Sequence, residues 1–311
     1  IDEGGPAFVN RPLPIGCNYK CPKCFSGGSD IYNEQLRQRG ISTELEPTLR
    51  KDLIRNAFDL GARTLVIAGA GEPLLYGGLD DILELTGNLG MNSVVFTNGS
   101  QLSKERAQSL FSRGTSIVFT YDSTCSKHYD MVTGTRGNHD FIRANLEGAL
   151  SLSENYTSIR SGHKILQFAI NTNPTVFTFN QAEGIDEIDE ISNLISGRAV
   201  HFVSHITPTG SAETNWELLT GKKDLVLNPQ LKEAEAMYGN GLGGSSRRKN
   251  GLCAYLHNGV TIYEGHYMFC PNAGLKVDFG RYPEISILEH IKEKKERLRS
   301  KGKPLCITRG E

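Results

Sequence analysis

The chain has 311 residues, a length that fits one large α/β domain or a main domain with a small second module. Its 34 basic and 35 acidic side chains give a formal charge of -1, which excludes the cationic excess of a general nucleic-acid binder. Hydrophobic residues make up 38% of the chain, and no uncharged apolar run approaches the ~20 residues that a membrane span needs. The first residues, IDEGGPAFVN, lack the features of a signal peptide, so we expect a cytoplasmic protein that binds neither nucleic acid nor membrane.

Short β-rich runs alternate with helical patterns along the first two thirds of the chain. The expected strands are FVNRPLP, TLVIAG, SVVFTN, TSIVFTYD, ILQFAIN and AVHFVSHI. The expected helices between them lie near 47–60, 79–89, 103–112, 139–153 and 184–196. Apolar strands that are each followed by an amphipathic helix predict a parallel sheet covered by helices, either open or curled toward a barrel. Ligands of such folds gather at the carboxyl ends of the strands.

The repeating pattern ends at about residue 207. The stretch GNGLGGSSRRKNG at 239–251 has the composition of a flexible linker. We therefore expect a main domain over residues 1–207, a connecting segment over 208–251 and a small α+β module over 252–311.

Seven cysteines, an odd number in a chain too large to need disulfide staples, indicate metal binding rather than disulfides. Cys17, Cys21 and Cys24 have the spacing CxxxCxxC in a loop that follows the first expected strand. A structural zinc site and a closed iron–sulfur cluster both need four ligands, so three close cysteines leave one coordination position open. The spacing therefore favours catalysis over a purely structural metal site.

The CxxxCxxC motif in PIGCNYKCPKCF resembles the signature of the radical S-adenosylmethionine (radical SAM) enzymes. In that family the three cysteines hold a [4Fe–4S] cluster, and its fourth iron binds S-adenosylmethionine, which one electron cleaves to methionine and a 5′-deoxyadenosyl radical. The resemblance implies these cofactors, with Cys17, Cys21 and Cys24 as cluster ligands. It also implies a partial (β/α)6 barrel of the TIM type. A chance match or a zinc site is the alternative.

The next two strands end in motifs that resemble segments of the same family. AGAGEPLL resembles the family's GGEP segment. This implies that Gly71 allows a close backbone approach, that Glu72 accepts a hydrogen bond from the ammonium group of S-adenosylmethionine, and that Pro73 belongs to the same binding segment. The resemblance also implies that Asn98, in TNG, lies close to the ligand. An ordinary strand-to-helix turn and a common Asn-Gly turn are the alternatives.

Polar residues after the fourth strand complete the expected cofactor site. Asp122 and Ser123 end that strand and would meet the ribose or the carboxylate of S-adenosylmethionine. Arg136 resembles a basic residue that pairs with the methionine carboxylate, which suits a guanidinium, although it would also serve as a solvated loop cation. The chain departs from the family at Lys23, where an aromatic residue usually packs near adenine.

The last three cysteines resemble the ligands of a second cluster. CAYLHNGVTIYEGHYMFC, which runs from Cys253 to Cys270, resembles the opening of the SPASM and Twitch modules found behind radical SAM barrels. VTIYEGHYMF has the alternation of a β-hairpin, ISILEHIKEKKERLRS has a helical pattern, and Cys306 follows it. The resemblance implies an auxiliary [4Fe–4S] cluster with an unidentified fourth ligand. Three unrelated buried cysteines are the alternative.

Cys125 is the remaining cysteine and lies three residues past Asp122. A thiol near the active face is a candidate catalytic group that returns a hydrogen atom to a substrate radical, with simple burial as the alternative. The single histidines along the chain are expected to be structural: His128, His139, His201 and His205. The basic run KEKKERLRSKGK is expected to be a solvated helix face, with a dock for an electron donor such as flavodoxin or ferredoxin as the alternative.

We therefore expect a radical SAM oxidoreductase or epimerase with a second cluster. Only sixteen residues precede Cys17, whereas peptide-modifying relatives often carry a recognition domain there, so the expected substrate is a small molecule such as a sugar or aminocyclitol in natural-product synthesis. Electron transfer to the second cluster would give dehydrogenation, and hydrogen return from Cys125 would give epimerisation. A peptide maturase and a non-catalytic iron–sulfur or zinc protein are the alternatives.

Overall fold

The structure is a computed structural model, and the part of the chain that it describes is a set of ranges: residues 5–27, 33–34, 37–38, 45–69, 71–160, 163–207, 209–223, 230–231, 234, 259–268 and 279–301. Side chains of residues 158–165 and 298–301 are outside this description. The predictions for Cys253, Cys270, Cys306 and the linker at 239–251 therefore lie outside the described residues.

One eight-stranded sheet forms the centre of the molecule. From edge to edge its strands are β10 (Val200–Val203), β7 (Phe168–Thr172), β4 (Thr115–Thr120), β3 (Asn92–Thr97), β2 (Thr64–Ile67), β1 (Phe8–Asn10), β11 (Gly259–Tyr263) and β12 (His266–Met268). Neighbours from β10 to β11 are parallel. This confirms the expected α/β class with six parallel strands from the βα repeat, and across the described ranges the sheet remains open.

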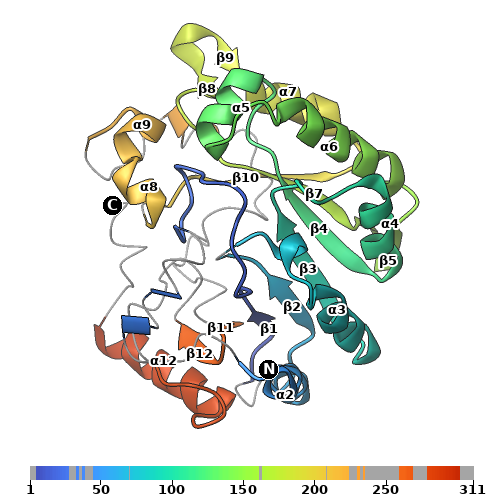
Figure 1. Ribbon diagram of the computed structural model, residues 1–311, viewed down its shortest axis with the longest axis vertical. Coiled ribbons are helices and arrows are strands. Elements are labelled where there is room, and N and C mark those ends of the chain that lie inside the picture. Colours follow the sequence, from blue (N-terminus) through green and yellow to red (C-terminus); the bar gives the residue numbers. More distant parts are fainter. Residues whose placement is uncertain are drawn as a thin grey trace.

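The five helices expected between the strands are all present. They are α2 (Pro47–Asp59), α3 (Leu79–Asn88), α4 (Lys104–Ser112), α6 (His139–Ser153) and α7 (Glu187–Ile195). Helices α2, α3, α4 and α6 follow one another along the outer side of the strands (Figure 1). Each buries an apolar stripe, as α6 does with Ile142, Leu146 and Ala149, because residues three or four apart share one face of a helix.

The sequence pattern missed several short elements. Helix α5 (Ser126–Thr133) follows β4 directly, and a 3₁₀ turn, η1 (Pro73–Leu75), follows β2. The remaining short elements are β5 (Thr157–Arg160), β6 (His163–Leu166), β8 (Phe179–Asn180), η2 (Gln181–Glu183), β9 (Ile185–Asp186), α8 (Ser211–Thr214) and α9 (Trp216–Thr220). These elements have too few residues to produce a clear periodicity.

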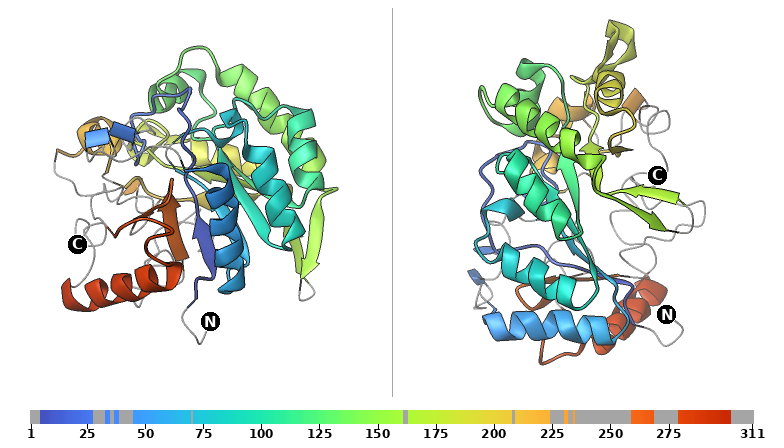
Figure 2. Two further views of the ribbon diagram at one scale, coloured as in Figure 1. Left: turned by 60° about the horizontal axis from the view of Figure 1, so that its bottom comes forward. Right: turned by 90° about the vertical axis from the view of Figure 1, so that its right-hand side faces the viewer.

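The hairpin expected in VTIYEGHYMF is confirmed as β11 and β12. Its turn is Glu264-Gly265, and β11 pairs with β1 in parallel, with Val9 opposite Val260. The hairpin therefore extends the main sheet at the β1 edge. The expected C-terminal helix is α12 (Ile287–Lys301), which lies beside the hairpin in both views of Figure 2. On α12 the His290 ring stacks on Tyr267 of β12, with 4.4 Å between the ring centroids.

A buried carboxylate fastens this hairpin to the start of the chain. Glu264 is fully buried and accepts hydrogen bonds from the Arg11 guanidinium (3.1 Å), the Arg50 guanidinium (2.9 Å) and the Leu45 amide (2.7 Å). Burial lowers the pKa of Arg11 to about 10, against the opposing effect of Glu264. Arg11 follows β1 directly, so the network anchors the beginning of the loop that carries Cys17.

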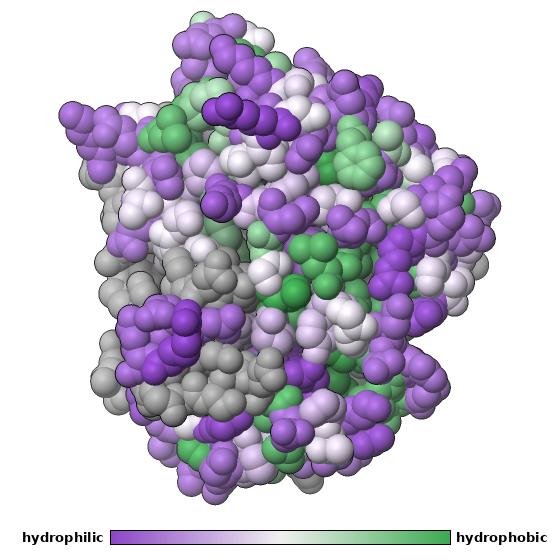
Figure 3. All heavy atoms as spheres, in the orientation of Figure 1, coloured by the Kyte–Doolittle hydropathy of each residue, from purple (hydrophilic) through white to green (hydrophobic). Residues whose placement is uncertain are grey.

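The surface in the orientation of Figure 1 is mostly hydrophilic, with apolar side chains gathered in the middle, around η1 (Figure 3). Leu75 of η1 is 37% exposed. Among the helices of the described residues, none has the length and apolar character required to cross a bilayer.

Replacing Glu264 by Gln should lower the free energy of unfolding by about 3–5 kcal/mol, because it leaves the buried Arg11 guanidinium and the partly buried Arg50 guanidinium without their counter-charge. Urea denaturation followed by circular dichroism measures this. Glu293→Gln on α12 is the matched control: its partner Arg297 is half-exposed, so the cost should stay below about 1 kcal/mol. Equal effects of the two substitutions would contradict the anchoring role of Glu264.

Candidate active site

The three N-terminal cysteines lie on one loop at the carboxyl end of β1. We call residues 11–27 the cluster loop. A tight turn brings the Cys24 amide within 3.0 Å of the Cys21 carbonyl oxygen. Cys17 is exposed, whereas Cys21 and Cys24 are half-buried. The loop therefore presents three thiols at the end of the sheet where parallel strands collect their ligands.

The surroundings of Cys17 and Cys21 disfavour an isolated thiolate at either residue. Burial raises the pKa of Cys21 to about 12, and the positive charge of Lys23 opposes this rise. Partial desolvation by the surrounding segments also raises the pKa of Cys17, although the residue is exposed, with smaller contributions from the charges of Glu72 and Cys24. A bound cation would lower the pKa of Cys17 and Cys21 again, because it stabilises the thiolate directly.

Glu72 is buried at the end of β2, next to the cluster loop. Its Oε1 atom accepts hydrogen bonds from the Leu74 amide (3.0 Å) and the Thr97 hydroxyl (2.7 Å), and its Oε2 atom accepts one from the Asn98 amide (2.7 Å). Burial raises the pKa of Glu72, and these donors oppose the rise. The carboxylate thus links the end of β2 to the end of β3, and Oε2 keeps room for one further donor.

Gly71 and Pro73 flank this carboxylate and fix the turn after β2. A Cβ atom on Gly71 would lie 1.8 Å from the Ile15 carbonyl oxygen, so only glycine permits this approach to the cluster loop. The Glu72 amide donates to the Gly16 carbonyl oxygen at 3.3 Å. Pro73 is the buried first residue of η1. The close backbone approach expected at Gly71 is therefore made to the loop that carries the cysteines.

Asn98 contacts the cluster loop from the end of β3. Its Nδ2 atom lies 3.7 Å from the Cys17 sulfur and donates to Asn18 Oδ1 at 2.9 Å. Its Oδ1 atom accepts from the Ser100 amide, and Asn18 in turn donates to the Ser100 hydroxyl. This amide network fixes Asn98 beside Cys17.

Lys23 and Asp122 form a buried ion pair that ties the cluster loop to two strands. Lys23 Nζ lies 2.5 Å from Asp122 Oδ2 and donates to Asn173 Oδ1 at 3.0 Å. Asp122 Oδ1 accepts from the Asn173 amide at 2.8 Å. Asp122 follows β4 and Asn173 follows β7, so one lysine joins three segments. The lysine that departs from the family pattern is thus a structural tether.

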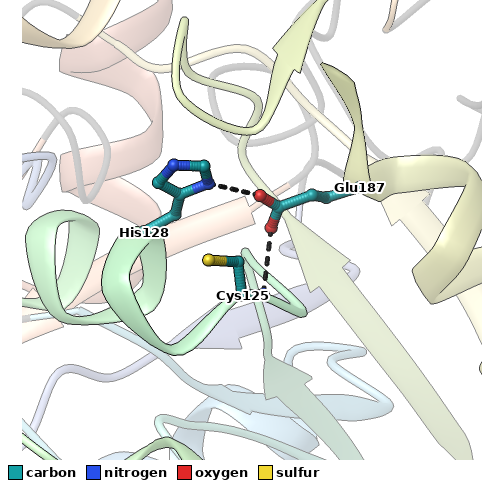
Figure 4. Close-up of side chains that lie close together, drawn as sticks. All are labelled: Cys125, His128 and Glu187. Carbon is teal, nitrogen blue, oxygen red and sulfur yellow. Dashed lines mark hydrogen bonds and ion pairs between the residues drawn. The ribbon is translucent and has the colours of Figure 1, made fainter. Parts of the chain in front are cut away.

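The Ser123 side chain contacts Glu187, the first residue of α7. The Ser123 hydroxyl donates to Glu187 Oε2, and the amides of Thr124 (3.0 Å) and Cys125 (3.3 Å) donate to the same atom. Glu187 Oε1 lies 2.5 Å from Nδ1 of His128 on α5. Figure 4 shows Cys125, His128 and Glu187 gathered between the ends of α5 and α7. Nothing in the sequence pointed to Glu187, although the CxxH spacing of Cys125 and His128 is visible there.

Arg136 is exposed on the loop after α5. With Lys127, Asp130 and Thr135 it lines a shallow pocket of about 430 Å³. A Cβ atom on Gly134, at the start of this loop, would lie 2.4 Å from the Lys20 carbonyl oxygen, so the loop packs on the cluster loop. Arg136 therefore belongs to a segment in direct contact with the loop that carries the three thiols.

Two of the single histidines have ordinary hydrogen-bond partners. His139 Nε2 lies 2.9 Å from the Tyr121 hydroxyl. His201 lies between the Thr172 and Ser192 hydroxyls, at 2.9 Å and 2.8 Å, and burial lowers its pKa to about 4. These contacts agree with structural roles, whereas His128 lies beside a thiol and a buried carboxylate.

Comparisons with known proteins find a matching family model and relatives that align with part of the chain. Residues 12–161 match the family model described as "Radical SAM superfamily". The Fe-coproporphyrin III synthase of Methanosarcina barkeri (strain Fusaro / DSM 804) is 28% identical over 193 residues, which are 60% of this chain and 44% of that protein. The S-adenosylmethionine-dependent nucleotide dehydratase of Flammeovirga pacifica is 30% identical over 97 residues, 31% of this chain and 32% of that protein. Both matches span less than half of the relative.

Solved structures with the same fold match nearly the whole chain. SuiB of Streptococcus suis, bound to the precursor peptide SuiA, superposes with a TM-score of 0.65 at 17% identity, covering 96% of this chain and 67% of SuiB. The enzyme anSMEcpe with bound AdoMet has a TM-score of 0.60 at 14% identity, covering 93% of this chain and 82% of that one. At such identities the similarity concerns the fold.

Replacing Lys23 by Met should lower the free energy of unfolding by about 3–5 kcal/mol, because it leaves the Asp122 carboxylate buried without its partner. Denaturant titration measures the loss. The double variant Lys23→Met, Asp122→Asn should recover part of it, since no unpaired charge remains. Additive losses in the double variant would contradict a direct ion pair.

Proposed function

Because residues 12–161 match the radical SAM family model, we propose that the protein cleaves S-adenosylmethionine reductively and abstracts a hydrogen atom from a carbon of a small-molecule substrate. The observation that carries the proposal is the cluster loop, on which Cys17, Cys21 and Cys24 lie at the carboxyl end of the sheet, beside Glu72 and Asn98.

The residues of the cluster loop fit a [4Fe–4S] cluster. The loop offers three thiols, and within the described ranges the remaining cysteine, Cys125, is held by its amide to Glu187 on another segment. Three thiolates on one loop leave an iron with an open position. The amide Nδ2 of Asn98, 3.7 Å from the Cys17 sulfur, is a donor of the kind that tunes such clusters.

The residues around the loop also fit S-adenosylmethionine. Glu72 Oε2 has capacity to accept from the ammonium group, and the Arg136 guanidinium, on a loop packed against the cluster loop, suits a carboxylate. Bound there, the cluster and S-adenosylmethionine supply the 5′-deoxyadenosyl radical. Asp122, committed to Lys23 and to the Asn173 amide, would act by holding the cluster loop in place. Ser123 would act by orienting Glu187.

The curated relatives support a small-molecule substrate, since the names of both matched enzymes refer to small molecules, a coproporphyrin and a nucleotide. Two outcomes follow from hydrogen abstraction. Loss of an electron from the substrate radical to an auxiliary [4Fe–4S] cluster, held by Cys253, Cys270 and Cys306, would make the enzyme an oxidoreductase. Return of a hydrogen atom from Cys125 would make it an epimerase. An electron donor of the flavodoxin or ferredoxin class would supply the reducing electron.

Peptide modification is a second candidate. SuiB, whose solved structure contains its precursor peptide, matches 96% of this chain in fold. Adding nucleoside triphosphates in one assay and a defined tryptic peptide mixture in another discriminates between the two classes. Stimulated formation of 5′-deoxyadenosine by one set only would identify the class of substrate.

The variant with Cys17, Cys21 and Cys24 all replaced by Ala should form no 5′-deoxyadenosine from S-adenosylmethionine and dithionite, because no ligand for the cluster remains. Liquid chromatography of the anoxic reaction measures the product. Ser151→Ala, on the outer helix α6, is the control and should match the wild type. Product at the wild-type rate from the triple variant would refute the proposed cleavage.

Anoxic reconstitution should load about eight irons per chain if two [4Fe–4S] clusters are present, against about four for a single cluster. Replacing Cys253 and Cys270 by Ala should then halve the iron content while leaving 5′-deoxyadenosine formation in place. Full iron content in that variant would eliminate the auxiliary cluster.

A further inference from the structure

Three residues outside the cluster loop offer a thiol, an imidazole and a carboxylate at one point. Cys125 precedes α5, His128 lies in its first turn, and Glu187 begins α7. One ligand atom of each lies within 4.8 Å of the others. Figure 4 shows the three side chains between the facing ends of the two helices. We propose that Cys125, His128 and Glu187 bind a zinc ion.

Hydrogen bonds fix the orientation of the Glu187 carboxylate, as is typical of carboxylates that bind metals. Glu187 is 6% exposed, and its Oε2 atom takes the Ser123 hydroxyl and the amides of Thr124 and Cys125. These donors leave Oε1 directed at His128 Nδ1, 2.5 Å away. Hydrogen bonds that fix a ligand's orientation are typical of metal sites. The polar contacts thus prepare a single oxygen atom for a cation.

The sequence spacing places the other two ligands correctly. Cys125 and His128 are three residues apart at the start of a helix, and residues with this separation lie on the same side of the first turn. Both are half-exposed, so a cation can enter from solvent. The His128 ring also lies against Phe177, with 6.4 Å between the centroids, which shields one side of the imidazole.

The chemistry of the three groups selects the cation. Sulfur, nitrogen and oxygen together match the ligands of Zn²⁺, whereas Mg²⁺ and Ca²⁺ prefer oxygen alone. The carboxylate of Glu190 on α7, which accepts a hydrogen bond from the Thr124 hydroxyl, adds negative charge near the site. Zinc would take the place of the hydrogen bond between His128 Nδ1 and Glu187 Oε1 and would displace the thiol proton of Cys125, and three protein ligands would leave a position for water.

A zinc ion here decides between the two outcomes of the proposed reaction. A zinc-bound thiolate has no S–H bond, so Cys125 cannot return a hydrogen atom while the metal is present. Zinc-loaded protein is thereby restricted to the oxidative outcome. The zinc site itself does not depend on cleavage of S-adenosylmethionine, so the two proposals can fail separately.

Zinc content tests the site directly. Cluster-reconstituted full-length protein is titrated anoxically with Zn²⁺ against a chromophoric chelator, and bound zinc is counted by mass spectrometry. The wild type should bind one zinc per chain that is absent from Cys125→Ser and His128→Gln. Ser123→Ala, which removes a hydrogen bond to Glu187, should weaken zinc binding by about 10- to 100-fold.

Asp189→Asn is the matched control, because it removes a negative charge from the same helix without touching the three ligands; it should bind zinc like the wild type. His128 is half-exposed, so the variant His128→Gln should remain folded. It therefore keeps the test decisive even if a substitution at the buried Glu187 unfolds the protein. X-ray absorption should show one sulfur at about 2.3 Å from zinc. Equal zinc in the wild type and His128→Gln, or several sulfurs around the metal, would overturn the proposal.

Discussion

The ion pair between Lys23 and Asp122 is the constraint on which the candidate site depends. The cluster loop contains little regular structure, so its cysteines need contacts elsewhere to keep a fixed position. Lys23 supplies them at the ends of β4 and β7, and Glu72 and Asn98 supply further ones at the ends of β2 and β3. A buried ion pair is costly to break from one side only, so it fixes the register of the loop against the sheet.

A second buried charge network holds the hairpin of β11 and β12 in place. Glu264 is fully buried in the turn between β11 and β12, where two arginines neutralise it. One of them, Arg11, follows β1 and begins the cluster loop. The two buried charge networks thus hold the loop at its beginning and near its last cysteine. The carboxyl ends of the strands determine where the site lies, and the paired charges hold the cluster loop against those strand ends.

Much of the fold could be predicted from the sequence, because long elements produce clear periodicity. Helix α6 has the bounds expected from its apolar spacing, and α7 begins three residues later than expected because Asp186 caps it by accepting from the Asp189 amide. Helix α5 was missed because its eight residues are mostly polar. The resemblance to the radical SAM family can be recognised in the sequence because the spacing of the cysteine motif is local.

Contacts between distant segments could not be predicted from the sequence. The sequence pattern marks Lys23 only as a departure from the family, and nothing local indicates that it pairs with Asp122, which follows a strand far along the chain. His128 was expected to be structural because its partner Glu187 lies 59 residues away. Spacing along the chain detects groups on one turn or loop, whereas groups assembled by the sheet require the three-dimensional structure.

Electron paramagnetic resonance of the reduced, reconstituted protein, recorded with and without S-adenosylmethionine, tests the central claim most directly. The account predicts a [4Fe–4S] signal that changes shape when S-adenosylmethionine is added, with hyperfine coupling to ¹⁷O in its labelled carboxylate, because one iron of the cluster is open to that ligand. A signal that is identical with and without S-adenosylmethionine would contradict it.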